Sequence, residues 1–170
     1  QKIMADNAAV FFATSAGVSS QLASDFIDTD FPVIDLSGDY RLPDPAEYEK
    51  WYHKPAASAE HLQKATYSLA DFYQSGTNYI ANPGCYATAT LLGLAPMVQS
   101  DLIDPDTIVV DAKSGTSGAG KKLTAITHFT ATNDNLQLYG LNTHKHNSKS
   151  GTDPLTRFSS VPRCYHLPQV

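Results

Sequence analysis

The sequence predicts an α/β fold in which strands and helices alternate as in a doubly wound parallel sheet. Two short apolar runs, residues 9–14 (AVFFAT) and 31–36 (FPVIDL), are typical of buried parallel strands. Between them, a loop at residues 15–17 precedes a helical pattern at residues 18–26. Strand, loop, helix and strand in this order form the βαβ unit of open sheets, which bind ligands at the carboxyl ends of their strands.

The middle of the chain gives weaker signals. Residues 37–68 are rich in Pro, Asp, Tyr and Lys and predict a long irregular connection, with one or two helical turns around residues 57–63. A further strand is predicted at residues 107–112 (TIVVDA), directly before a glycine-rich loop.

Composition excludes several classes of function. The chain has 170 residues, 42% of them apolar, which is enough for one domain or two small ones. A net charge of −5 without basic runs argues against nucleic acid as a partner, and no apolar run is long enough to span a membrane. Cys85 and Cys164 are far apart and form no CxxC pair, so we expect neither a zinc knuckle nor a disulfide scaffold, and a cytoplasmic location.

Cys85 stands between a predicted strand end at residues 79–81 and a predicted helix at residues 86–100. The turn Asn82-Pro83-Gly84 separates the strand from the cysteine. Unpaired amides and the helix dipole at a helix start favour a thiolate over a thiol, so the position suits a nucleophile. A small cysteine that merely begins a core helix is the alternative. The buried side of this helix is expected to carry Leu91, Leu92, Leu94 and Val98.

The glycine-rich loop at residues 115–122 (GTSGAGKK) nearly matches the phosphate loop GxxxxGK[ST]. It departs where Lys122 replaces the hydroxyl residue that would hold Mg²⁺. The glycines at 115, 118 and 120 still allow backbone N–H groups to approach an anion, and a flexible surface loop is the alternative.

Histidine is the usual proton-transfer partner of a cysteine nucleophile, and the chain has six: His53, His61, His128, His144, His146 and His166. His144 and His146 flank Lys145, and residues two apart on an extended segment point the same way. One of the pair is therefore a candidate acid/base for Cys85. No third ligand follows at a metal-site spacing, so no metal is expected.

Four motifs occur in the order and at the spacing found in one family. They are residues 34–42 (IDLSGDYRL), 81–89 (ANPGCYATA), 114–122 (SGTSGAGKK) and 144–146 (HKH). The chain thereby resembles the N-acetyl-γ-glutamyl-phosphate reductases, NADPH-dependent enzymes of arginine biosynthesis. NPGCY together with SGTSGAG separates this family from the related aspartate-semialdehyde and glyceraldehyde-phosphate dehydrogenases.

The resemblance implies the remainder of an NADP-binding Rossmann-type domain at residues 1–83. An α+β catalytic and dimerisation domain, like that of glyceraldehyde-phosphate dehydrogenase, is implied at residues 84–170, and the family's enzymes act as homo-oligomers. It also implies that Cys85 forms a thioester with an acyl phosphate and that His144 serves as the catalytic histidine. The implied cofactor-binding residues are Ser114, Gly115, Ser117, Gly118 and Gly120, and the implied substrate-binding residues are Arg41, Asn82 and His146.

Two departures from the family carry expectations of their own. The family's glycine-rich dinucleotide fingerprint is absent, so we expect this chain alone to bind NADPH weakly or not at all. After His146, residues 147–170 lack the family's next helix and strand, and we expect an aberrant tail there. An inactive remnant, a cofactor-free Cys/His acyl hydrolase and a phosphate-binding module on the glycine loop remain open alternatives.

Overall fold

The computed structural model describes residues 2–72, 76–104 and 107–139 of the chain. Within them, four short strands form one sheet in the order β1-β2-β4-β3, and every neighbouring pair is parallel. The strands are β1 (Val10–Phe12), β2 (Val33–Asp35), β3 (Ala65–Tyr67) and β4 (Tyr79–Ala81). The predicted Rossmann-like α/β fold is therefore confirmed, and the runs at 9–14, 31–36 and 79–81 do contain strands.

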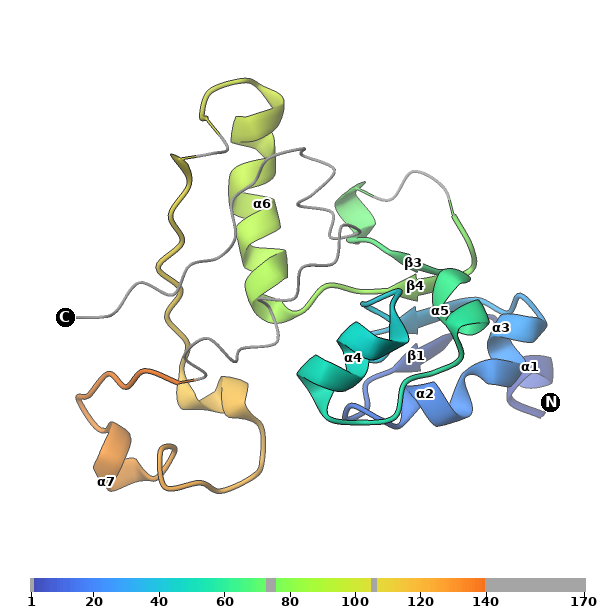
Figure 1. The fold of residues 1–170 in the computed structure, drawn as a ribbon, viewed down its shortest axis with the longest axis horizontal. Helices are drawn as coiled ribbons and strands as arrows, with labels where there is room; N and C mark the ends of the chain where they lie inside the picture. Colours follow the sequence, from blue (N-terminus) through green and yellow to red (C-terminus); the bar gives the residue numbers. More distant parts are fainter. Residues whose placement is uncertain (1, 73–75, 105–106, 140–170) are drawn as a thin grey trace.

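The described helices differ more from the predictions. Helices α1 to α5 gather around the sheet, and α6 extends away from the end of β4 (Figure 1). The α-helices are α1 (Lys2–Asp6), α2 (Ser19–Leu22), α3 (Ser24–Asp28), α4 (Pro45–Tyr52), α5 (Ala59–Gln63), α6 (Cys85–Gln99) and α7 (Phe129–Thr132); the 3-10 helices are η1 (Ala70–Phe72) and η3 (Thr116–Ala119). The single helix predicted at 18–26 is in fact two, which meet at Ala23.

The buried core lies on one face of the sheet. Val33 is aligned with Val10 on one side and with Tyr79 on the other, so their side chains share a face. The core residues are Phe12, Ala23, Ile27, Val33, Tyr40, Ala57, Leu62, Tyr79 and Ala81. On the opposite face, Phe11 of β1 is 64% exposed. Among the described residues, the core that the helices build is thus concentrated on a single side of the strands.

Helix α4 contradicts the prediction of an irregular connection at residues 37–68. Asp44 precedes the helix and its side chain accepts a hydrogen bond from the amide of Ala46 (2.9 Å), and Pro45 occupies the first helical position. The helix buries Tyr48, whose ring stacks on that of Tyr52 at 4.7 Å between centroids. These two tyrosines give the segment an apolar side that its polar composition conceals. The same connection also holds α5, close to the predicted turns, and β3.

Gly38 permits a close contact between α4 and the loop after β2. A Cβ atom added at Gly38 would lie 2.1 Å from Cε1 of Tyr52, so the ring would have to move. We expect Gly38→Ala to lower the free energy of unfolding by about 2 kcal/mol, measured by urea denaturation. Gly93 of α6 is the matched control, because a Cβ there meets nothing within 4 Å. Gly93→Ala should stabilise slightly through helix propensity, and equal midpoints for the two variants would contradict the contact.

Helix α6 begins one residue before the predicted start and ends one residue earlier. Leu91 and Ala95 are its buried side chains, spaced as on one helix face. The prediction for Leu92 was wrong: this side chain is 48% exposed because it lies about 100° around the helix from Leu91. No helix in the described part of the chain has the length and apolar character needed to cross a membrane.

The strand predicted at residues 107–112 is also wrong. In the described structure, Thr107 has 3-10 conformation, and the residues that follow it form no strand. Its apolar Val109 is 63% exposed. A strand requires a neighbouring strand to accept and donate its backbone hydrogen bonds, and the four described strands pair only with one another. An apolar run alone was therefore insufficient.

Candidate functional site

Cys85 lies at the first position of α6, just beyond the carboxyl end of β4. Gly84 is the residue before the helix, in an extended conformation, and its carbonyl accepts the first helical hydrogen bond from the amide of Thr88 (2.8 Å). The side chain of Cys85 is exposed and forms no disulfide. A thiol here faces solvent next to the first-turn amides, which have no helical acceptor of their own.

The loop between β4 and Cys85 is held at several points. The Asn82 amide donates to the Asp35 carbonyl (2.8 Å), extending the pairing of β4 with β2 by one residue. The Asn82 side chain donates to the Pro83 carbonyl (3.0 Å), which also accepts from the Thr88 hydroxyl (3.4 Å). Pro83 itself is buried. The side-chain amide of Asn82 is thus directed into the loop that precedes the cysteine.

Arg41 reaches the same loop from the segment that follows β2. Its Nε donates to the carbonyl of Asn82 and its Nη2 donates to the carbonyl of Leu36, both at 2.8 Å. The structure therefore brings together three of the predicted site residues, Arg41, Asn82 and Cys85. They lie where two neighbouring parallel strands end, which is the edge at which open sheets bind ligands.

Tyr139 and Tyr86 also belong to this region, although neither is among the site residues predicted from the sequence. Their hydroxyl oxygens lie 2.7 Å apart in a hydrogen bond. Burial, then this hydrogen bond and the neighbouring charges of Tyr86 and Cys85, raise the pKa of Tyr139. The bond connects residue 139 to the first turn of α6. The position of Tyr86 directly after Cys85 was the available signal, whereas nothing local marks Tyr139.

A cavity of about 610 Å³ lies between the glycine-rich loop and residues 124–139, with Tyr139 in its wall. Ser114, Gly115 and Gly118 line it, and Ile126, Leu136 and Leu138 supply apolar wall. Ser117 and Gly120 belong to the same turn but not to the wall. The volume is in the range of small-molecule sites, and the mixture of apolar walls with a few polar groups is typical of them.

Two glycines of this loop have structural reasons to lack a side chain. A Cβ at Gly118 would lie 2.6 Å from the Ser114 hydroxyl, and Gly120 has a φ of +79°. Residues other than glycine rarely adopt that φ value, so the turn depends on glycine at position 120. The loop is exposed, as the flexible-loop alternative requires, but residues 116–119 form a 3-10 turn.

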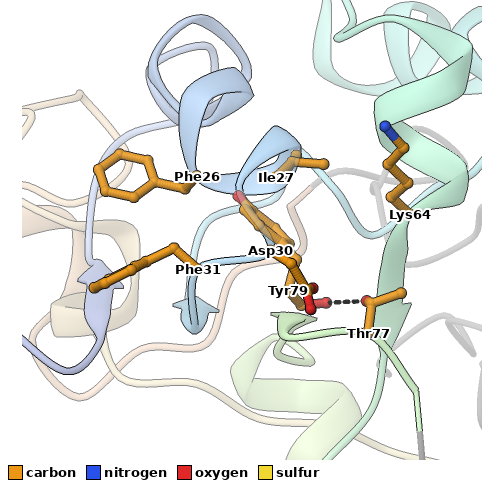
Figure 2. Close-up of a pocket in the computed structure, with 7 residues that line it drawn as sticks. All are labelled: Phe26, Ile27, Asp30, Phe31, Lys64, Thr77 and Tyr79. Carbon is orange, nitrogen blue, oxygen red and sulfur yellow. Dashed lines mark hydrogen bonds between the residues drawn. The ribbon is translucent and has the colours of Figure 1, made fainter. Parts of the chain in front are cut away.

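A second, small cavity of about 60 Å³ lies at the other end of the sheet (Figure 2). Phe26, Ile27 and Phe31 lie on one side and Lys64 and Thr77 on the other (Figure 2). The Thr77 hydroxyl donates to the Tyr79 carbonyl (3.3 Å). None of the predicted site residues lines this cavity, and it adjoins the amino ends of the strands. Its position and size make it a packing defect near the core rather than a second candidate site.

A buried carboxylate, that of Asp39, orders the segment that carries Arg41, and the sequence did not reveal it. Asp39 is fully buried and accepts hydrogen bonds from the amide of Gly17 (2.8 and 2.9 Å), the amide of Ser20 (3.0 Å) and the hydroxyl of Ser19 (3.0 Å). The hydroxyl of Tyr48 donates to it at 2.6 Å. Burial and this bond to Asp39 raise the pKa of Tyr48. Asp39 thereby joins the loop after β1, the start of α2 and helix α4.

Asp35 forms a second buried centre at the end of β2. It accepts from the amide of Ser37 (2.7 Å) and from the hydroxyl of Tyr79 (2.8 Å). Burial, and next the charge of Asp35, raise the pKa of Tyr79. The rings of Tyr40 and Tyr79 pack with their centroids 4.5 Å apart. The motif at residues 34–42 therefore supplies two buried carboxylates that order the chain next to Arg41.

The predicted histidines His144 and His146 lie outside the described residues. The tail at residues 147–170, where we expected a departure from the family, lies outside them as well.

Comparisons with known proteins identify the family. Residues 1–81 match the model of the NAD binding domain of semialdehyde dehydrogenases, and residues 85–150 match the model of their dimerisation domain. The N-acetyl-gamma-glutamyl-phosphate reductase 2 of Lactiplantibacillus plantarum is 63% identical over 144 residues, which is 85% of this chain and 42% of that protein. The N-acetyl-gamma-glutamyl-phosphate reductase of Limosilactobacillus fermentum is 63% identical over 147 residues, 86% of this chain and 43% of the relative.

A third relative, the N-acetyl-gamma-glutamyl-phosphate reductase of Lactococcus lactis subsp. lactis, is 58% identical over 146 residues, again 86% of this chain and 43% of its own length. The chain thus spans less than half the length of the curated relatives it matches. The two family models follow one another along the chain on either side of the loop before Cys85. The chain therefore belongs to the semialdehyde dehydrogenase family, and its resemblance to the N-acetyl-γ-glutamyl-phosphate reductases is confirmed.

Proposed function

We propose that this chain carries the nucleophile of an N-acetyl-γ-glutamyl-phosphate reductase. The reaction reduces N-acetyl-glutamyl 5-phosphate to N-acetyl-glutamate 5-semialdehyde and releases phosphate, a step of arginine biosynthesis. The observation that carries this proposal is the exposed thiol of Cys85 at the start of α6, at the carboxyl edge of the sheet. Relatives that bear the name of this reductase support the substrate.

In the first step, the Cys85 thiolate attacks the acyl carbon and the carbon–oxygen bond to phosphate breaks, which leaves a thioester and free phosphate. The attacked carbonyl oxygen becomes negatively charged on the way. Amides of the first turn of α6, including that of Cys85, are the proposed donors to this oxygen. A thiolate suits the step because it is both a good nucleophile and a good leaving group.

The second step converts the thioester to the aldehyde. The cofactor NADPH, when bound, supplies the hydride that reduces the thioester carbonyl. His144 is the proposed acid that protonates the carbonyl oxygen and then takes the proton back as the carbon–sulfur bond breaks, which regenerates the thiolate. His146 and Asn82 are proposed to contact the substrate.

The glycine-rich loop is the proposed cofactor contact. Ser114, Gly115 and Gly118 line a cavity large enough for the nicotinamide end of a dinucleotide, and its apolar wall suits a flat ring. Ser117 and Gly120 shape the turn that places them. These residues fit NADP(H), and the match of residues 1–81 to an NAD binding domain supports a dinucleotide.

We further propose that the two domains meet at residues 83 and 84, in the loop before Cys85. The matched dimerisation domain supports a homo-oligomer, and the biosynthetic reaction supports a cytoplasmic location.

The decisive experiment mixes the protein with N-acetyl-glutamyl phosphate and follows both the mass of the Cys85 peptide and the absorbance of NADPH. A reductase gains an acyl group on Cys85 without NADPH, and oxidises NADPH when it is added at a concentration that offsets the weak binding expected of this chain. Acylation with hydrolysis but no NADPH oxidation supports the acyl hydrolase instead. Neither change, in a folded sample, supports the phosphate-binding module or an inactive remnant.

A further inference from the structure

We propose that Arg41 is a positioning residue whose guanidinium ties the loop that presents Cys85 to the end of β2. The proposal rests on the proposed function, because the group it positions is the Cys85 nucleophile. It assigns to Arg41 a role that acts through the protein backbone and not through direct contact with the substrate.

The guanidinium bridges two neighbouring strands at their carboxyl ends. Nε donates to the carbonyl of Asn82, which follows β4, and Nη2 donates to the carbonyl of Leu36, which follows β2. Both bonds measure 2.8 Å and have a charged donor, so they are stronger than bonds between neutral groups. Nε and Nη2 form the side-on edge with which arginine grips a carboxylate or phosphate in bidentate fashion. In this structure that edge is occupied by the protein backbone.

The Arg41 bond acts on the part of the loop that lies between the pairing of the sheet and the bonding of the helix. Pro83 has no N–H group and cannot donate a hydrogen bond. Backbone pairing of the sheet ends with the Asn82 amide, and helical bonding begins at the carbonyl of Gly84. The carbonyl of Asn82 lies between these two bonded regions, so the Arg41 bond fixes the peptide plane from which the chain turns toward Cys85.

Arg41 is itself held in place by its surroundings. Its amide donates to the Gly38 carbonyl (3.4 Å), and Gly38 packs against the ring of Tyr52. Burial raises the pKa of Tyr52, while the charge of Arg41 and a hydrogen bond with its side chain act in the opposite direction. The adjacent Asp39 is anchored to the start of α2. The guanidinium therefore projects from a loop that several hydrogen bonds hold, and it connects this loop to the one before the cysteine.

The test compares two alkylating reagents that differ in charge, neutral iodoacetamide and anionic iodoacetate, on the full chain. The extent of reaction at Cys85 is read from peptide masses, which separates it from Cys164. A positioning arginine speeds both reagents because it places the thiol near the first-turn amides. An arginine that contacts an anionic substrate speeds iodoacetate alone.

We expect Arg41→Gln to slow Cys85 alkylation by both reagents about tenfold, with their rate ratio unchanged. Arg41→Lys should recover only part of the rate, because an ammonium cannot span the two carbonyls as a guanidinium does. Lys64→Gln is the control: Lys64 is a cation at the opposite end of the sheet that pairs with Glu60 (2.9 Å) and Asp28 (3.5 Å). Its replacement should leave both rates as in the wild type.

A selective loss of iodoacetate reactivity in Arg41→Gln overturns the proposal and makes Arg41 an anion contact. Unchanged rates with both reagents also overturn it. If Arg41→Gln does not fold, Tyr52→Phe keeps the stacked ring and removes only the hydroxyl near Arg41, and a wild-type rate in this variant counts against the proposal. Failure of the proposed function appears elsewhere: wild-type Cys85 would then react no faster than the same cysteine in urea.

Discussion

Cys85→Ser should abolish acylation of residue 85 by the acyl phosphate, and should slow whatever NADPH oxidation the wild-type chain shows by roughly a thousandfold or more. A serine hydroxyl is not ionised near neutral pH, so it attacks the acyl carbon far more slowly than a thiolate. An oxygen ester at this position would also release the aldehyde less readily, since an alkoxide is a poorer leaving group than a thiolate. The measurements are the mass of the Cys85 peptide and the absorbance of NADPH.

Cys164→Ser is the matched control, because it removes the chain's other thiol. It should leave both readings at the wild-type level. Persistent acylation in Cys85→Ser, located by peptide mass at another side chain, would reject Cys85 as the nucleophile. Since the Cys85 side chain is exposed, the substitution itself should not change the unfolding midpoint.

Asp39→Ala should lower the free energy of unfolding by about 3–5 kcal/mol. The carboxylate accepts hydrogen bonds from the amides of Gly17 and Ser20 and from the hydroxyls of Ser19 and Tyr48. Without it, the buried hydroxyls and the partly buried amides lose this acceptor, and each donor bears part of its desolvation cost. Urea denaturation followed by circular dichroism gives the difference.

Asp25→Ala tests whether any aspartate would behave in this way. Asp25 is exposed in the first turn of α3, where its charge is favourable to the helix dipole, and its loss should cost less than about 1 kcal/mol. Asp39→Asn should lower the free energy of unfolding by an intermediate amount. The amide oxygen of asparagine still accepts hydrogen bonds, but its NH2 group would face N–H and O–H groups that are themselves donors. A loss below 1 kcal/mol in Asp39→Ala would contradict the network.

The strands and helix that carry Cys85 were predictable because their signals are local. Apolar β-branched and aromatic runs mark β1, β2 and β4, and a Pro-Gly turn marks the start of α6. Helix α4 was not predicted, although Asp44 and Pro45 are a normal helix start, because its buried side consists of tyrosines within a polar stretch. The three residues of β3 are defined by their pairing with β4, which no local pattern reports.

The candidate site divides in the same manner. Cys85 and the glycine loop stand out as motifs, and the structure gives them a helix start and a cavity wall. The bond of Arg41 to the Asn82 carbonyl, and the hydrogen bond between Tyr86 and Tyr139, join residues 41 and 53 positions apart. Such contacts arise from tertiary packing, so the sequence could nominate Arg41 but not its hydrogen-bonding partners.

The register of strand β4 fixes how far the sulfur atom of Cys85 lies from the sheet. It is bonded to β2 on one side and β3 on the other, and the Asn82 amide continues this alignment to within three residues of the cysteine. Inserting one residue between Tyr79 and Cys85 would shift the thiol by roughly 3.3 Å or force the strand to slip and invert its faces. The distance between the sheet and the sulfur atom is thus fixed by the number of residues between them. A change in loop length that is tolerated elsewhere on the surface would here displace the thiol and reduce its reactivity.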